Sequence, residues 1–264
     1  MPAEIGGYQF DCCLRDMVAR DVFFAGCFAT QEIAFLRGVL RPGMRFVDVG
    51  ANWGLFTLVA AYLVGTSGTV AAMEPDPRIF GRLKANVERN NLKQVQVFEV
   101  AIADRDSSLL LAAHDHGGNN WGISRLIEGD AADEITLNVS SRQLDPLLDE
   151  AGIETIDLLK IDVEGAEDMV LKGMDSGLSS HRYRRILLEL HPLELAERGR
   201  TACEVIEELI SKGYEGYAFD NSKAAVRRAY YHPWLHFSEY IRPLQQGLTD
   251  AAPHTLWFSP GTKS

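Results

Sequence analysis

The sequence predicts a doubly wound α/β fold, a seven-stranded, mostly parallel sheet covered by helices on both faces. Short apolar segments alternate with helix-length amphipathic segments along most of the 264 residues, a pattern typical of such sheets. The clearest segment is FVDVGANWGL at 46–55, a buried strand that leads through a glycine-containing turn into a helix. Acidic residues follow several predicted strands, at the edge where open α/β sheets bind their ligands.

The composition is that of an ordinary globular protein, with 46% hydrophobic and 24% charged residues. The net charge of −11 disfavours a nucleic-acid partner, because such partners bind to basic patches. We find neither an apolar run of roughly 20 residues, the length that crosses a bilayer, nor the pattern of a signal peptide. The four cysteines lack the spacing of a metal site or a disulfide framework. We therefore expect a cytoplasmic protein without a membrane partner.

One domain is expected over residues 1–264, because no linker divides the chain. Residues 1–40 are mostly helical in pattern, with apolar residues at helical spacing before Arg41, Pro42 and Gly43 end the helix. We expect this segment to be a helical cap that packs on the sheet edge or covers the site. Residues 41–264 form the core.

The turn after the first core strand distinguishes between two cofactors. Gly50 and Gly54 allow a tight turn and a close approach of a ligand, and the turn leads into the N-terminus of a helix. In the dinucleotide fingerprint G-x-G-x-x-G the second glycine lets the backbone approach a pyrophosphate, but here Asn52 stands in its place. This disfavours an NAD-dependent oxidoreductase. The pattern D-x-G-x-N-x-G resembles motif I of the class I S-adenosylmethionine (SAM) methyltransferases, in which Asp48 would lie near a cationic sulfonium.

The next elements supply two further cofactor candidates. A helix over 55–64 precedes a strand over 69–73, which ends at Glu74. A carboxylate at the end of the second strand can accept hydrogen bonds from both ribose hydroxyls, so Glu74 is the candidate ribose ligand. An amphipathic helix over 77–90 and a strand over 95–100 follow, and Ala101 is a candidate neighbour of adenine.

An insertion interrupts the alternation between 104 and 155. Residues 108–113 and 135–140 are predicted to be strands that pair with each other, and 143–151 is predicted to be a short helix. The intervening segment HDHGGNNWGISRL is rich in glycine and asparagine and is predicted to be a surface loop over the site. We interpret His114 and His116 as solvated side chains rather than metal ligands.

Acidic residues gather after the next two strands. The strand over 156–161 is followed by Asp162 and Glu164 and then by a helix through 171, and the strand over 185–190 carries Glu189 and precedes His191. Neighbouring parallel strands end at the same edge of a sheet, so we expect these four side chains to approach one another. Buried acids need a partner, which a metal ion, a cationic ligand, a substrate hydroxyl or Lys160 could supply. The alternative is that they cap helices or pair with basic residues.

The C-terminal part completes the sheet. A helix over 201–212 precedes two strands over 214–219 and 255–258, which we expect to be antiparallel. The intervening aromatic segment AYYHPWLHFSEYIRP at 229–243 is loop-like in pattern and is a candidate substrate wall or homo-oligomer contact.

The chain resembles the FkbM-like methyltransferases between about positions 40 and 192. LLKIDVEGAEDMVLKGM at 158–174 is the most specific of the matching segments, and the other segments occur in the order of the family: PGMRFVDVGANWGLFTL at 42–58, MEPDP at 73–77, LKANVERNN at 83–91, VAIAD at 100–104, NNWGISRL at 119–126 and ILLELHP at 186–192. Residues 1–30 and 220–250 match no pattern of the family, and we expect them to select the substrate.

The resemblance implies a Rossmann-like class I SAM-dependent methyltransferase that acts on a hydroxyl of a sugar, aminocyclitol, polyketide or other natural-product intermediate. It implies that Glu74 binds the ribose and that Ala101 lies against adenine. The residues that it implies at the amino-acid and sulfonium end of SAM are Asp48, Gly50, Asn52 and Gly54.

An aliphatic hydroxyl needs a base or a Lewis acid to become a nucleophile. Our hypothesis is that Asp162 and Glu189 hold Mg²⁺ or Mn²⁺, or the acceptor hydroxyl itself. His191 would be the general base, and Glu164 belongs to the same group of catalytic candidates. Three alternatives remain: an N-methyltransferase of a small-molecule amine, a non-catalytic SAM-binding module, and a nucleic-acid methyltransferase. Clustered carboxylates disfavour the second, and the charge and the absence of an N/D-P-P-Y/F motif disfavour the third.

Overall fold

A computed structural model describes the fold. It covers residues 2–5, 7–11, 17–25, 28–113, 124–127, 135–232, 236–244 and 255–261. His114 and His116, which the sequence analysis singled out, lie outside these ranges, as do Trp121 and Trp234 of the two loop-like segments.

The N-terminal segment contains a hairpin as well as helices. Strands β1 (Pro2–Ile5) and β2 (Tyr8–Asp11) pair antiparallel and precede helices α1 (Met17–Ala25) and α2 (Thr30–Val39). The sequence analysis predicted a mostly helical segment here and did not predict the hairpin. The backbone N–H of Asp11 donates to Asn86 Oδ1 at 2.9 Å, and that of Gln9 donates to Asn90 Oδ1 at 2.8 Å. The hairpin is thus held by amide side chains of a distant helix, a contact that no local pattern indicates.

The first half of the core follows the predicted alternation closely. Its elements are β3 (Arg45–Val49), α3 (Leu55–Val64), β4 (Thr69–Met73), α4 (Pro77–Arg89) and β5 (Val95–Phe98). Helix α4 begins where the sequence indicates, because Asp76 accepts a hydrogen bond from the backbone N–H of Arg78 and Pro77 occupies the first turn.

The insertion forms a small second sheet. Its strands are β6 (Ala101–Ile102), β7 (Ser107–Ala113), β8 (Ser124–Ile127) and β9 (Ile135–Arg142), in the order β6-β9-β7-β8. The predicted pairing of 108–113 with 135–140 is confirmed. Residues 124–126, predicted to be loop, instead belong to β8. Leu126 lies opposite Leu111 of β7, so pairing with an existing apolar strand stabilises a segment too short to be recognised alone.

The second half contains more helices than the sequence indicated. Its elements are α5 (Leu144–Glu150), β10 (Leu158–Ile161), α6 (Glu167–Gly173), α7 (Asp175–Ser179), β11 (Ile186–Glu189), α8 (Pro192–Glu197), α9 (Ala202–Ser211), β12 (Tyr214–Phe219), α10 (Lys223–Tyr231), β13 (Ile241–Pro243) and β14 (Thr255–Pro260). The prediction that residues 229–243 are loop-like is wrong at both ends, because α10 extends to Tyr231 and β13 pairs with β12. Helix α10 buries Ala229 and packs on α2.

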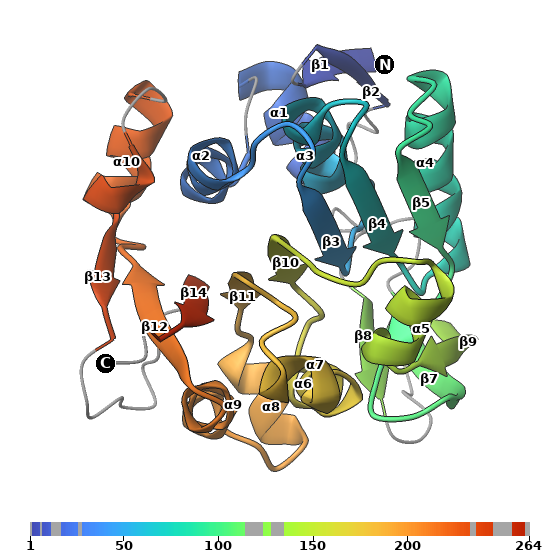
Figure 1. The fold of residues 1–264 in the computed structure, drawn as a ribbon. Coiled ribbons are helices and arrows are strands. Elements are labelled where there is room, and N and C mark those ends of the chain that lie inside the picture. The colour runs from blue at the N-terminus through green and yellow to red at the C-terminus, as the bar shows by residue number, and fades with distance from the viewer. Residues whose placement is uncertain are drawn as a thin grey trace.

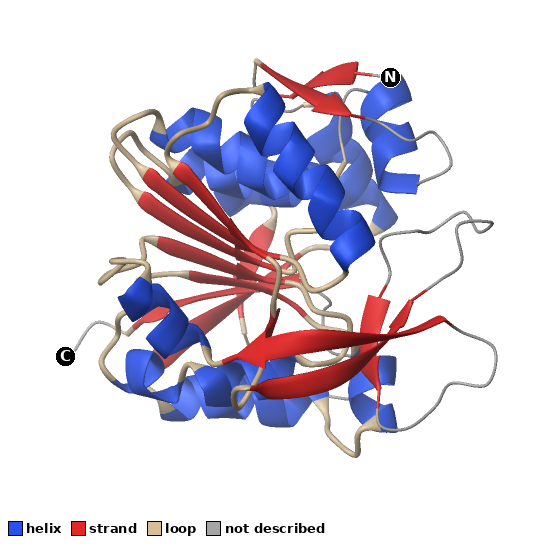
Figure 2. Ribbon diagram, turned by 90° about the vertical axis from the view of Figure 1, so that its right-hand side faces the viewer, coloured by secondary structure: helices blue, strands red, loops and turns tan. Residues whose placement is uncertain are grey.

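The main sheet has the order β13-β12-β14-β11-β10-β3-β4-β5. The five strands from β11 to β5 are parallel neighbours, and β14 and β12 are antiparallel. The predicted fold is confirmed, with β13 added as an eighth strand at the edge. Figure 2 shows the strands between two layers of helices, and Figure 1 labels the elements of each layer. One core contains residues from α2, α3 and α4, and the other contains residues from α5, α6, α7 and α9.

The helices of the described segments are all too short or too polar to span a membrane.

Candidate active site

The turn between β3 and α3 has the backbone conformation that its glycines allow. Gly50 and Gly54 have φ angles of +80° and +90°, and Asn52 between them has φ of +52°. The N–H groups of Gly50 and Ala51 donate to the carbonyl oxygen of Met73, at 3.0 and 2.9 Å. A Cβ atom on Gly50 would lie 1.8 Å from the carbonyl oxygen of Asp162. The turn therefore packs directly on the segment that follows β10, and only glycine fits there.

Glu74, at the end of β4, is buried and joined to this turn. Its Oε2 accepts the backbone N–H of Asn52 and its Oε1 accepts that of Asp76, both at 2.9 Å. Burial raises the pKa of the Glu74 carboxyl to about 8, although both N–H groups favour the ionised form. The side chain is thus fixed in orientation at the carboxyl edge of the sheet.

A cavity opens at this edge, with about 620 Å³ of empty space when its open mouth is included. Four of the six predicted cofactor residues line it, namely Gly50, Asn52, Glu74 and Ala101. Asp162 and Glu164, from the group of predicted catalytic residues, line the same cavity.

The other two predicted cofactor residues, Asp48 and Gly54, are not among the lining residues. Asp48 is buried within β3, and its Oδ2 accepts a hydrogen bond from Thr57 Oγ1 at 2.6 Å. Burial raises the pKa of Asp48. A Cβ atom on Gly54 would lie 2.7 Å from Leu83 of α4. Both residues therefore support the conformation of the turn from the side that faces away from the cavity lining.

The insertion supplies a wall of the cavity, in a segment that the sequence analysis expected over the site as a loop rather than as a strand. Leu111 of β7 and Ser124 and Leu126 of β8 line it. Ser124 Oγ donates to Asp76 Oδ2 at 3.0 Å, which joins β8 to the segment that carries Glu74. The segment NNWGISRL, which ends within β8, was a signal of family resemblance, but no periodicity in it indicated a strand.

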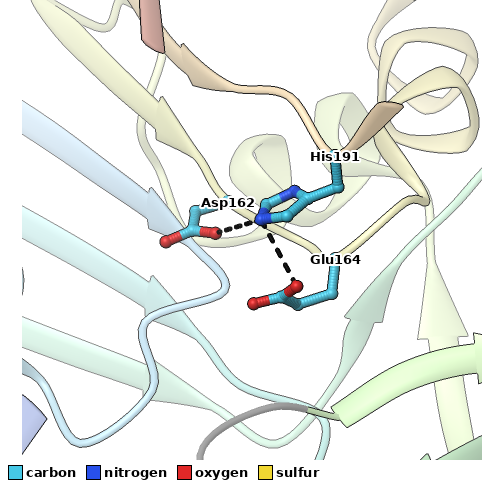
Figure 3. Close-up of side chains that lie close together, drawn as sticks. All are labelled: Asp162, Glu164 and His191. Atoms are coloured by element: carbon cyan, nitrogen blue, oxygen red, sulfur yellow. Dashed lines mark ion pairs between the residues drawn. The ribbon is translucent and has the colours of Figure 1, made fainter. Parts of the chain in front are cut away.

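Three predicted catalytic residues meet after β10 and β11. His191 Nε2 lies 3.3 Å from Glu164 Oε2 and 3.8 Å from Asp162 Oδ1 (Figure 3). One ligand atom of each residue lies within 4.8 Å of those of the other two. Among the described residues, the group with this spacing contains Asp162 and Glu164 with His191, and it does not contain Glu189.

Glu167, which the sequence analysis did not single out, fixes the His191 ring. Its Oε1 lies 2.7 Å from His191 Nδ1, and the side chain is fully buried. We assign a proton to Nδ1, because an ionised carboxylate can only accept. Burial would lower the pKa of His191, but the hydrogen bond with Glu167 and the carboxylates of Glu164 and Asp162 raise it to about 9. Nε2 then faces Asp162 and Glu164.

Glu189 belongs instead to a buried charged group centred on Lys160. The Lys160 ammonium donates to Asp162 Oδ2 at 2.9 Å and lies 4.5 Å from the centre of the Phe56 ring. The expected partnership of Lys160 with one of the acids is therefore observed. Burial opposes the charge on Lys160, but Asp162, Asp48 and Glu189 raise its pKa to about 12. The Asp162 carboxylate and burial raise the pKa of Glu189 to about 8.

Helix α2 adds another acid to this group. Glu32 of α2 accepts a hydrogen bond from Thr255 Oγ1 at 3.2 Å, and Thr255 is the partner of Glu189 across β11 and β14. Burial raises the pKa of Glu32, and Lys160 lowers it. Glu32 and Thr255 are more than 200 residues apart in the chain, so no local pattern in the sequence could indicate that they pair.

Comparison with known proteins gives one family match and several relatives. Residues 48–215 match the model of the methyltransferase FkbM domain. The 31-O-demethyl-FK506 methyltransferase FkbM of Streptomyces tacrolimicus is 29% identical over 200 residues, which are 66% of this chain and 74% of that protein. The 2-O-methyltransferase NoeI of Sinorhizobium fredii is 32% identical over 181 residues, 64% of this chain and 72% of that protein.

The same comparison with solved structures returns the methyltransferase FkbM of Methylobacillus flagellatus KT. It has a TM-score of 0.48 and 14% identity to this chain. The alignment covers 92% of this chain and 59% of that protein, so this chain spans less than two thirds of its length.

Proposed function

The chain belongs to the FkbM methyltransferase family, and we propose that it transfers the methyl group of SAM to a hydroxyl oxygen of a small molecule. One observation carries the proposal. The cavity that contains the residues for a nucleoside cofactor, Gly50 and Glu74, also contains Asp162 and Glu164, which can activate a hydroxyl. Cofactor and catalytic acids thus share one cavity at the carboxyl edge of the sheet.

The residues of the cavity fit SAM. Glu74 is an oriented carboxylate that can accept two ribose hydroxyls, and the apolar Ala101, Leu111 and Leu126 suit an adenine ring. We assign the methionine end to the turn at Gly50 and Asn52, with Asp48 behind it. SAM supplies, when bound, an electrophilic methyl group on a cationic sulfonium.

The chain's own residues then have two tasks. The first is alignment, because displacement at carbon requires the acceptor oxygen in line with the methyl group and the sulfur, and such alignment can contribute about 7–11 kcal/mol. The second is removal of the hydroxyl proton. We assign this proton transfer to the group of Asp162, Glu164 and His191, which adjoins the cofactor cavity.

The acceptor is proposed to be a hydroxylated natural-product intermediate such as a sugar or an aminocyclitol. The names of two relatives specify an oxygen as the methylated atom, 31-O in one and 2-O in the other, which supports O-methylation over N-methylation.

We propose further that residues 1–40 act as a cap of a single domain. In support, Glu32 of α2 reaches the edge of the sheet beside Glu189.

The proposal is tested by incubating the protein with SAM labelled with carbon-13 in the methyl group and a panel of hydroxylated acceptors, each with and without an amino group. Carbon-13 NMR distinguishes an O-methyl from an N-methyl product. O-methyl products with members that lack an amine would support the proposal. Methyl transfer only to nitrogen would replace it with the N-methyltransferase alternative.

Asp162→Asn is expected to lower kcat by about 100-fold, because a general base typically contributes roughly 10²–10⁴-fold. The change keeps the size of the side chain, so the KM for SAM should stay within a few-fold. The measurement is steady-state kinetics with the best acceptor of the panel. Glu197→Gln on α8 is the control, because its side chain is 64% exposed and pairs with Arg125 rather than the site. An unchanged kcat in Asp162→Asn would remove Asp162 from the mechanism.

Glu74 should make cofactor binding depend on pH. With a pKa of about 8 in the free protein, it is mostly protonated at pH 7, whereas two hydroxyl donors require the ionised carboxylate. Binding of S-adenosylhomocysteine should therefore release a proton. The affinity should rise by up to about tenfold per pH unit between pH 6 and 8 and level off above the pKa.

Calorimetry at pH 7 in phosphate and in Tris measures this proton, because the two buffers have different ionisation enthalpies. Glu74→Gln should bind more weakly, and its affinity should change little with pH. Equal heats in both buffers, together with a flat pH profile for the unmodified protein, would show that Glu74 does not bind the ligand as a carboxylate.

A further inference from the structure

We infer that Asp162, Glu164 and His191 bind one divalent transition-metal ion and prefer Mn²⁺ to Mg²⁺. The binding of the ion does not depend on the proposed function, but its role in activating the acceptor hydroxyl rests on that function. The three residues come from two neighbouring strand ends and turn toward one point (Figure 3). Their ligand atoms all lie within 4.8 Å of one another, and His191 Nε2 is 3.3 Å from Glu164 and 3.8 Å from Asp162. An ion placed between them would need only small side-chain movements.

Two side chains behind the group hold two of the ligands in orientation. Glu167 bonds His191 Nδ1 at 2.7 Å, so the other ring nitrogen is left for the ion. This carboxylate–histidine arrangement is typical of metal sites. Lys160 bonds Asp162 Oδ2 at 2.9 Å, which leaves Oδ1 on the side of His191. Glu167 is fully buried and Lys160 is nearly so, so water has little access to these two side chains and competes little for their hydrogen bonds.

The site is open on the side of the cavity. The side chains of Asp162, Glu164 and His191 are 26%, 25% and 15% exposed, and the first two line the cofactor cavity. With three protein ligands, an ion would keep positions for water or for an acceptor oxygen, as catalytic sites do. An ion there could lower the pKa of a bound hydroxyl.

The ligand set determines which ion is preferred. Mg²⁺ takes oxygen ligands and water in nearly ideal octahedral geometry, whereas an imidazole nitrogen favours first-row transition metals. One imidazole with two carboxylates therefore suits Mn²⁺, and Co²⁺ still more. Sites for Mg²⁺ rarely contain histidine because its nitrogen is a softer ligand than a carboxylate.

The experiment is a titration of the full-length protein with Mn²⁺, followed by electron paramagnetic resonance, because bound Mn²⁺ loses the sharp signal of the free ion. We expect one Mn²⁺ per chain, displaced by Mg²⁺ only at a concentration at least about ten times higher. His191→Asn should reduce Mn²⁺ affinity more than Mg²⁺ affinity, because it replaces nitrogen with oxygen. Glu164→Gln should reduce both at least about tenfold.

The matched control is Glu189→Gln, the same change in the neighbouring acid outside the group. It should keep Mn²⁺ affinity within about threefold. Glu167→Leu should weaken Mn²⁺ about 10–100-fold, and Glu167→Gln should restore most of that affinity because its amide oxygen can still accept from Nδ1. Rescue by glutamine would identify Glu167 as a positioning residue rather than a packing one.

Three results would overturn the inference: no Mn²⁺ bound at millimolar concentration, Mg²⁺ competing at equal concentration, or equal losses in Glu164→Gln and Glu189→Gln. Near-UV circular dichroism verifies that each variant is folded, and Asp162→Asn replaces a variant of Glu164 or His191 that is not. Binding of S-adenosylhomocysteine, measured in the same samples, separates this inference from the proposed function. Mn²⁺ binding without S-adenosylhomocysteine binding would refute the function alone, and the reverse result would refute the metal site alone.

Discussion

Replacing Gly50 with alanine is expected to abolish the binding of S-adenosylhomocysteine. The new Cβ would lie 1.8 Å from the carbonyl oxygen of Asp162, a backbone atom that cannot move alone. The φ angle of +80° adds about 1–2 kcal/mol of strain for a residue with a side chain, and overpacking adds typically 1–3 kcal/mol. The turn must therefore separate from the segment after β10. This separation would both open the proposed cofactor cavity and displace Asp162.

Calorimetry with S-adenosylhomocysteine and a thermal melt measure the two consequences of Gly50→Ala. The melting temperature should fall by on the order of 10 °C. Gly152→Ala is the matched control, because its φ is +71° and no atom lies within 4 Å of the added Cβ. It should lose some stability through strain and keep full affinity. Unchanged affinity in Gly50→Ala would mean that the turn is not part of the cofactor site.

Replacing Glu74 with alanine is expected to weaken S-adenosylhomocysteine by roughly 1,000-fold with little loss of folded structure. Two ribose hydroxyls would lose a charged acceptor, and hydrogen bonds to charged groups are worth about 1.5–3 kcal/mol each. The N–H groups of Asn52 and Asp76 would lose their partner as well. The loss of affinity for S-adenosylhomocysteine should exceed that in Asp162→Asn, because Asp162 is assigned to the chemical step rather than to cofactor binding.

A ligand comparison makes the Glu74 test specific. The unmodified protein should bind the 2′-deoxy analogue of S-adenosylhomocysteine much more weakly than the parent compound, whereas Glu74→Ala should bind both equally. Glu88→Ala on α4, a change of an exposed acid, serves as the control. If Glu74→Ala still discriminated between the two ligands, the ribose would be bound elsewhere.

The candidate catalytic residues show how far spacing along the chain can predict a site. Asp162 and Glu164 follow a strand, and His191 follows the neighbouring strand, so the rule that parallel strands end at one edge was enough to bring them together. The same rule included Glu189, which is not among the residues whose ligand atoms lie within 4.8 Å of one another. The alternation of side chains between the two faces of a sheet holds only within a strand. Strand β11 ends at Glu189, so the direction of the His191 side chain is set by the turn that leads into α8 and not by this alternation.

The sequence by itself determined the parallel sheet, the glycine-containing turn at Gly50 and the position of the carboxylate Glu74 at the end of β4, because each of these follows from local spacing and from the general topology of α/β sheets. Only the tertiary structure decided which acids lie together, that Glu167 fixes His191, that Lys160 holds Asp162, that β8 is a strand, and that Glu32 reaches Thr255. These contacts join segments far apart in the chain. Their geometry depends on loop conformation and on the packing of helices against the sheet, and a local pattern of residues specifies neither.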